Sequence, residues 1–114
     1  MSIVRIESNH RLSQAVVHGG LVYLTGQAGD EGADVEAQTR YVLSQIDRLL
    51  AKAGSDKSKI LSATILLADV AEFPLMNTVW DAWVDQANPP ARATLEARMV
   101  KPEYRVEIIV VAAT

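Results

Sequence analysis

The sequence of 114 residues contains no cysteine. That absence excludes a disulfide framework, a thiolate nucleophile and a cysteine-based metal site. The two histidines, His10 and His18, show neither HxxE nor HxxxH spacing, so we expect no metal ion. No nucleophile elbow supports a serine-based triad.

The chain also lacks an apolar run of the ~20 residues that a membrane helix requires. Its first residues, MSIVRIES, alternate polar and apolar side chains and do not form the apolar core of a signal peptide. Eleven basic and fourteen acidic residues give a net charge of −3, which argues against a nucleic-acid partner. We therefore expect a cytoplasmic protein without a membrane partner. Its 49% hydrophobic content suits one domain that spans residues 1–114.

Alternating and β-branched residues predict strands in the first part of the chain. Residues 3–7 alternate between polar and apolar side chains. Residues 12–18 and 21–26 are two further β-prone runs, and Gly19-Gly20 separates them. A two-residue glycine connection between such runs is typical of a β-hairpin.

From residue 34 to residue 53 the apolar positions change to a helical period and fall on one stripe. Asp34 is a suitable N-cap for this helix, and Gly54 is suited to end it. Residues 60–68 are then apolar on both parities, which predicts a central strand that is covered on both faces.

A second helix is predicted to follow Asp69 and Glu72, which have the spacing of a capping box, and to end near Asn88. Its Trp80 and Trp83 are expected in the core or in an interface rather than at a ligand. The order of elements indicates the α+β class, with both helices on one face of a single sheet. Because the strands are apolar on both sides, we expect another copy of the chain to cover the second face.

The C-terminal quarter of the chain carries the polar residues that need an explanation. Two β-prone runs flank Lys101-Pro102, and we expect them to pair as an antiparallel hairpin with Glu96 opposite Glu107. One face of this hairpin would then carry a polar set, namely Arg92, Thr94, Glu96, Arg105 and Glu107. A carboxylate inside an apolar run is costly unless it is paired or protonated. The polar face is therefore a plausible floor for a pocket that binds a small carboxylate-bearing molecule.

The run PPARATLEARMVKPEYRVEIIVVAA resembles the C-terminal signature of the RidA (YjgF) family of enamine and imine deaminases. The earlier segment YLTGQ is similar to the family's Ser-Gly-Gln strand end, so the resemblance covers nearly the whole chain. It implies a chorismate-mutase-like fold with a mixed sheet, and a homotrimer with sites in the clefts between subunits. It also implies hydrolysis of 2-aminoacrylate-type or other amino-acid-derived imines to 2-oxo acids and ammonia, without a cofactor.

The resemblance implies roles for particular residues. Arg92 matches the arginine that grips the substrate carboxylate, and Glu107 matches the acidic residue near the hydrolytic water, so these two are the catalytic candidates. Thr25 and Asn77 match residues that contact the substrate in the cleft. Such a site would bind a small carboxylate-bearing imine.

Two further substrate-binding candidates depart from the family pattern. Thr94 stands where the family commonly has a cysteine, a change that imine hydrolysis tolerates because it needs no covalent thiol step. Leu12 stands where a tyrosine is often found, which removes a phenolic hydrogen-bond partner from the pocket and adds apolar surface.

Simpler interpretations of these residues remain open. Arg92 could pair with Glu96 or Glu107, and Glu107 could pair with Arg98 or Arg105. Asn77 could be an ordinary exposed helix residue. A different class of function is also open, because a carboxylate clamp would equally serve a non-catalytic homotrimer that binds a small metabolite for regulation.

Overall fold

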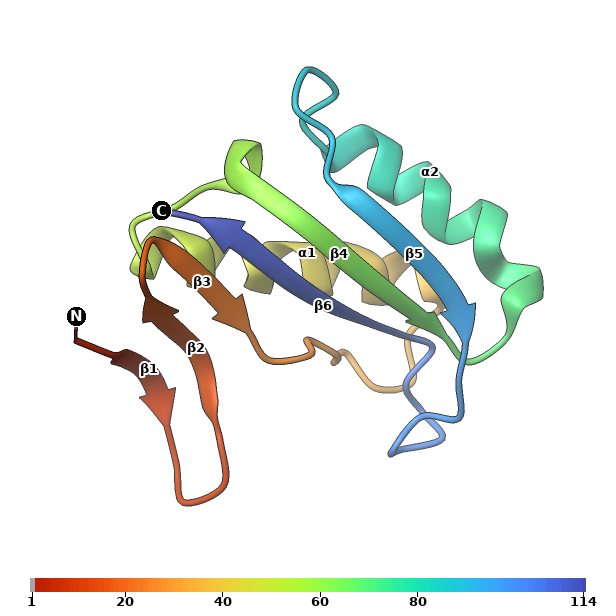
Figure 1. The fold of residues 1–114 in the computed structure, drawn as a ribbon. Coiled ribbons are helices and arrows are strands. Elements are labelled where there is room, and N and C mark those ends of the chain that lie inside the picture. Colours follow the sequence, from red (N-terminus) through yellow and green to blue (C-terminus); the bar gives the residue numbers. More distant parts are fainter. Residues whose placement is uncertain (1) are drawn as a thin grey trace.

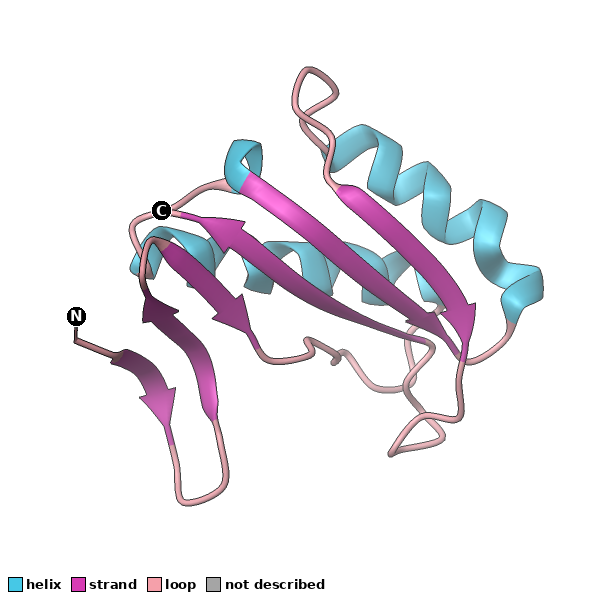
Figure 2. Cartoon of the chain, viewed as in Figure 1, coloured by secondary structure: helices cyan, strands magenta, loops and turns pink. Residues whose placement is uncertain are grey.

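The computed structural model describes residues 2–114. It contains one six-stranded sheet, and Figure 1 shows both α-helices on the same face of that sheet. Figure 2 shows the same view with helices and strands in different colours. In chain order the elements are β1 (Val4–Ser8), β2 (Ser13–His18), β3 (Leu21–Leu24), α1 (Val35–Lys52), the 3-10 helix η1 (Lys57–Lys59), β4 (Ile60–Leu67), the 3-10 helix η2 (Val70–Glu72), α2 (Phe73–Trp83), β5 (Ala91–Glu96) and β6 (Val106–Ala113).

The sheet is mixed, and its strand order is β1-β2-β3-β6-β4-β5. Every neighbouring pair is antiparallel except β4 and β5, which run parallel and are joined through α2. The predicted α+β class, with a single mixed sheet and two helices on one face, is confirmed. The predicted central position of β4 is also confirmed, because β4 lies between β6 and β5.

The predicted hairpin between the last two strands is wrong. β4 separates β5 from β6, so Glu96 is beside Leu67 and Glu107 is opposite Leu66 of that strand. Backbone bonds hold the end of β4 on both sides: Ala97 N donates to the Leu67 carbonyl, and Ala68 N donates to the Arg105 carbonyl. An apolar strand gains more from two neighbours than from one, and this non-local pairing outweighs adjacency in the sequence.

The first hairpin and the first helix form as predicted. Gly19 and Gly20 connect β2 to β3 with φ values of 59° and 80°, the left-handed region that a tight two-residue hairpin turn needs. Asp34 Oδ1 accepts a hydrogen bond of 2.8 Å from Ala37 N at the start of α1. Gly54, with φ 79°, follows the helix C-cap.

Helix α2 ends at Trp83, earlier than the predicted end near Asn88. The backbone turns extended at Val84, where ψ is 144°. Asp85 then bonds Ala87 N and the Asn88 amide, a local arrangement that competes with helix continuation. The Lys57 amino group donates to the Trp83 carbonyl at 2.6 Å and so satisfies the helix end.

The two faces of the sheet differ in what covers them. On the helix side, Val22, Ile65 and Val110 are at most 1% exposed. On the other side, here called the open face, Tyr23 is 47% exposed and Ile109 is 37% exposed. The sheet is therefore apolar on both faces, but the described residues cover only one of them. Within residues 2–114 no helix is long and apolar enough to cross a membrane.

Candidate functional site

Arg92 lies on the helix side of β5, beside Ala63 of β4. Its Nη1 donates a hydrogen bond of 2.8 Å to Asn77 Oδ1 on α2. The guanidinium carbon lies 5.6 Å from the ring centroid of Phe73 and 5.4 Å from that of Trp80. A half-buried guanidinium is thus held by one amide oxygen and two aromatic faces.

Arg92 carries its charge without a carboxylate partner in the described chain. No acidic oxygen in residues 2–114 lies within 4.0 Å of its guanidinium. Glu96, which the sequence allowed as a partner, instead accepts a 3.0 Å bond from Val70 N. Pairing with an acid of the same chain therefore does not account for Arg92. A half-buried cation without a counter-ion is a favourable place for an anion.

Thr94 lies two residues further along β5, beside Ile65, and so faces the same side as Arg92. Its hydroxyl oxygen is buried and has no hydrogen-bond partner within the part of the chain that the structure describes. Buried hydroxyls are nearly always bonded, so this position suits a water molecule or another polar group as a partner. We call Arg92, Asn77 and Thr94 the Arg92 half-site.

Glu107 projects from the opposite face. Its neighbours Val106 and Ile108 are fully buried beneath the helices, so alternation along β6 places Glu107 on the open face. A Cβ added at Gly26 would lie 2.5 Å from Glu107 Oε2, so in this position the Glu107 carboxylate packs directly against the Gly26 backbone. Among the described residues, neither Arg98 nor Arg105 forms an ion pair with Glu107. We call Thr25, Gly26 and Glu107 the Glu107 half-site.

The chain holds the Glu107 half-site in place through backbone bonds on both sides of Gly26. Thr25 N donates to the Gln14 carbonyl at 2.9 Å, and Gln27 N donates to the Ile108 carbonyl at 2.9 Å. The side chain of Gln27 is 7% exposed and donates to Gln14 Oε1 and to the Thr25 carbonyl. This role of Gln14 and Gln27 was not predicted from the sequence, although Gln27 is part of the YLTGQ segment.

Leu12 lies in the connection between β1 and β2, and its side chain is 43% exposed. Its N–H donates to Asn9 Oδ1 at 3.0 Å, which fixes the turn. Two residues later, Gln14 holds Thr25, so Leu12 belongs to the same end of the sheet as the Glu107 half-site.

The predicted common face for Arg92 and Glu107 is therefore wrong. It depended on a direct pairing of β5 with β6, whereas the insertion of β4 puts the two residues on opposite sides of the sheet. One copy of the chain carries both half-sites but does not bring them together.

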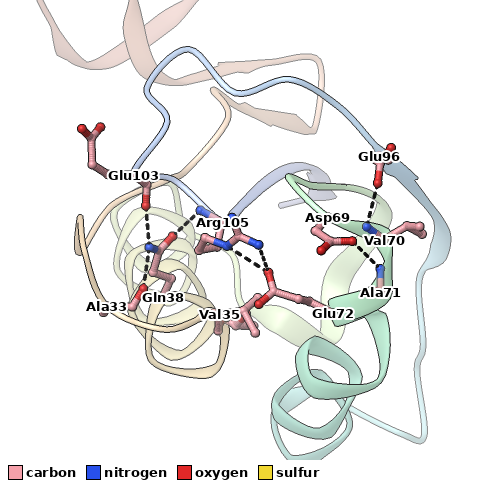
Figure 3. A network of polar contacts seen from close by, with 11 residues as sticks. Ala33, Val35, Gln38, Asp69, Val70, Ala71, Glu72, Glu96, Glu103 and Arg105 are labelled. Carbon is pink, nitrogen blue, oxygen red and sulfur yellow. Dashed lines mark hydrogen bonds and ion pairs between the residues drawn. The ribbon is translucent and has the colours of Figure 1, made fainter.

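Figure 3 shows the polar network at the start of β6. Arg105 Nε donates to Glu72 Oε1 at 2.9 Å, and Arg105 N donates to Gln38 Oε1 at 2.7 Å. Gln38 is fully buried and donates to the carbonyls of Ala33 and Glu103. Glu72 thus bonds Arg105 and does not complete the capping box that the sequence predicted. Asp69 caps the 3-10 helix η2 by accepting a bond from Ala71 N. The network fixes the start of β6, and with it the register of Glu107.

A second contact fastens the same end of the molecule. Lys101 Nζ donates to Glu31 Oε1 at 2.9 Å, and the hydroxyl of Tyr104 lies 3.3 Å from the same oxygen. The Lys101 ammonium holds the pKa of the Glu31 carboxyl below its usual value. This ion pair joins the loop that follows Gln27 to the loop that precedes β6.

A groove of about 430 Å³ lies between α1 and α2, away from both half-sites. Trp83 Nε1 donates to Asp47 Oδ2 at 2.9 Å across it, and Lys57 lies 5.4 Å from the Trp83 ring centroid. These polar groups bond one another, which is typical of a contact that joins two helices.

Comparison with known proteins agrees with this fold. A family model described as Endoribonuclease L-PSP matches residues 2–114. The chain is 48% identical over 113 residues to the RutC family protein YoaB of Escherichia coli, with 99% of each chain covered. It is 33% identical over 107 residues to the 2-iminobutanoate/2-iminopropanoate deaminase of Bos taurus, with 88% of this chain and 77% of that protein covered.

A solved structure of a family member has the same fold. A member of the YjgF protein family from Neisseria meningitidis matches with a TM-score of 0.97 and 46% identity, over 100% of this chain and 96% of that one. The family resemblance read from PPARATLEARMVKPEYRVEIIVVAA and YLTGQ is confirmed. The chain belongs to the RidA/YjgF family, whose matching model carries the description Endoribonuclease L-PSP.

Proposed function

We propose that this protein is an enamine/imine deaminase. It hydrolyses 2-aminoacrylate-type enamines, and other imines derived from amino acids, to 2-oxo acids and ammonia. The observation that carries the proposal is the half-buried Arg92 guanidinium, which has no carboxylate partner in residues 2–114 and is suited to bind one from a ligand. The name of the Bos taurus relative, an iminobutanoate/iminopropanoate deaminase, supports the same chemistry.

The assembly that completes the site is a homotrimer in this proposal. The two half-sites lie on opposite faces of one sheet, so a second copy has to supply the missing half of each site. The open face, with Tyr23 and Ile109 exposed, is the apolar surface that a second copy would cover. Light scattering should give three times the chain mass of 12.4 kDa. A stable monomer at micromolar concentration would contradict both the assembly and the shared site.

The proposed reaction needs only proton transfers and the addition of water. A proton moves to the terminal carbon of the enamine to give the imine, water adds to the imine carbon, and ammonia leaves to give the 2-oxo acid. Arg92 holds the substrate carboxylate, and Thr25 with the neighbouring backbone orients the imine. Glu107 positions water or takes a proton from it. Asn77, Thr94 and Leu12 shape the pocket around the substrate.

The test is direct turnover. 2-Aminoacrylate and 2-iminobutanoate are generated by a coupled enzyme, and release of 2-oxo acid and ammonia is followed with and without the protein. We expect release to be faster than spontaneous hydrolysis in buffer. Equal rates would reject the deaminase. Binding of 2-oxo acids without turnover would instead favour a regulatory homotrimer that binds small metabolites, since the same clamp serves both functions.

A further inference from the structure

We infer that Phe73, Asn77 and Trp80 of α2 are positioning residues, which hold the Arg92 guanidinium in place while leaving it without a neutralising charge. The inference rests on the proposed function in one respect only, namely that Arg92 binds a carboxylate. It assigns to α2 a role in binding through another residue, in addition to its packing on the sheet.

The three side chains form one stripe of α2. They are spaced at i, i+4 and i+7, the spacing that places residues on a common face of a helix. This stripe faces β5, because all three side chains contact the Arg92 guanidinium. Trp83, on the same helix, packs its ring against that of Trp80, with 5.4 Å between the ring centroids, and donates to Asp47 of α1.

The chemistry of the three groups explains why they suit a binding arginine. Burying a guanidinium costs free energy, and a carboxylate would offset that cost but would occupy the group that the ligand needs. Aromatic faces attract the cation without carrying a charge of their own. The amide oxygen of Asn77 takes up only Nη1, which leaves Nε and Nη2 without partners in residues 2–114. A fork with two free donors is the geometry that binds a carboxylate at two points.

The most informative variant is Asn77→Asp. It keeps the size of the side chain but places a carboxylate where Oδ1 now lies, 2.8 Å from Arg92 Nη1. An internal acid would then neutralise Arg92 and compete with the ligand. We expect the dissociation constant for 2-oxobutanoate to rise by at least about tenfold, while thermal stability is kept or increased. Thr78→Asp is the matched control, because it adds the same charge at the exposed neighbouring position.

Trp80 is tested by two substitutions with opposite expectations. Trp80→Leu removes the aromatic face and should weaken 2-oxobutanoate binding severalfold, but should cause no further loss in an Arg92→Gln background. Trp80→Phe keeps an aromatic face and should keep most of the affinity, which preserves a test if Trp80→Leu does not fold.

The inference is overturned if Asn77→Asp binds 2-oxobutanoate as tightly as Thr78→Asp does. It is also overturned if Trp80→Leu loses as much affinity in the Arg92→Gln background as it does alone, or if the wild type binds no 2-oxo acid. Because binding is measured without turnover, the two proposals can fail separately. A wild type that binds 2-oxobutanoate through these residues but hydrolyses no imine would remove the deaminase and leave the positioning role intact.

Discussion

Arg92 and Arg105 are both half-buried arginines. Arg92 donates to Asn77 within α2, and Arg105 donates to Glu72, the residue just before α2. Arg105 pairs with Glu72, and their side chains are 33% and 25% exposed. Arg92 meets an amide and two aromatic rings and has no acid within 4.0 Å in the described residues. Arg105 has a carboxylate partner inside the chain, whereas Arg92 has none within the described residues. We therefore expect Arg105 to stabilise the fold and Arg92 to bind a ligand.

The largest effect is expected from Arg92 itself. Arg92→Ala should lower kcat/KM for imine hydrolysis by ~1000-fold or more, since both the charge and the orientation of the substrate are lost. Circular dichroism and oligomer mass should stay near those of the wild type. Arg92→Lys should recover little, because the ammonium lacks the planar fork. Full turnover by Arg92→Ala would place the site elsewhere.

Glu107 tests the other half-site. Glu107→Gln should keep the shape of the protein and its affinity for 2-oxo acids, and should slow turnover by ~100-fold, as is typical of a lost general base. Single-turnover kinetics together with ligand titration measure the two quantities. If Glu107→Gln fails to assemble, the carboxylate has a structural role. Glu107 would then resemble the ion-paired Arg105 more than the unpaired Arg92.

Arg105 should give the opposite pattern. Arg105→Ala removes bonds to Glu72 and leaves that carboxylate without its partner, so we expect a loss of about 1–2 kcal/mol in the free energy of unfolding. The expected loss is small because water reaches both side chains and screens the ion pair. Affinity for 2-oxobutanoate should change little. Urea unfolding and ligand titration on the same samples would decide, and a variant that keeps its stability but loses affinity would reverse the roles of the two arginines.

The smallest effect is expected at Leu12. If Leu12 lines the pocket, a leucine in place of a tyrosine would lack one neutral hydrogen bond, worth about 0.5–1.5 kcal/mol, and would add apolar surface. The wild type should therefore favour imines from leucine or methionine over small polar imines, with each methylene worth ~1–3 kcal/mol at most. Leu12→Tyr should shift the ratio of kcat/KM values toward the small imine. An unchanged ratio would put Leu12 outside the pocket.

The elements that the sequence predicted best are those with local signals. Asp34 and Gly54 mark the ends of α1, and Gly19-Gly20 marks a hairpin, because these signals act within a few residues of the chain. The end of α2 was placed too late because Asp85 stops it through bonds to the residues that follow, which competes with a favourable apolar pattern.

The candidate site was predicted less completely, because its geometry depends on distant contacts. The family motifs single out Arg92 and Glu107 as candidates, but the faces of these two residues depend on which strands pair, and the α2 crossover sets that pairing. A one-strand error in pairing placed the two residues together when they lie apart. The contact of Trp80 with Arg92 could not be read from the sequence, since it arises only when α2 packs over β5.

Within residues 2–114, strand β5 lies at the edge of the sheet, and β4 is its one strand neighbour. Amide groups on such a strand exchange with solvent through local opening, at a lower free energy than the global unfolding of the chain. Each opening of β5 would move Arg92 away from α2 and break the contacts of its guanidinium with Phe73, Asn77 and Trp80. The Arg92 half-site would therefore persist only as long as β5 stays paired with β4. A neighbouring copy that covered this strand would lengthen that lifetime as well as supply the second half of the site.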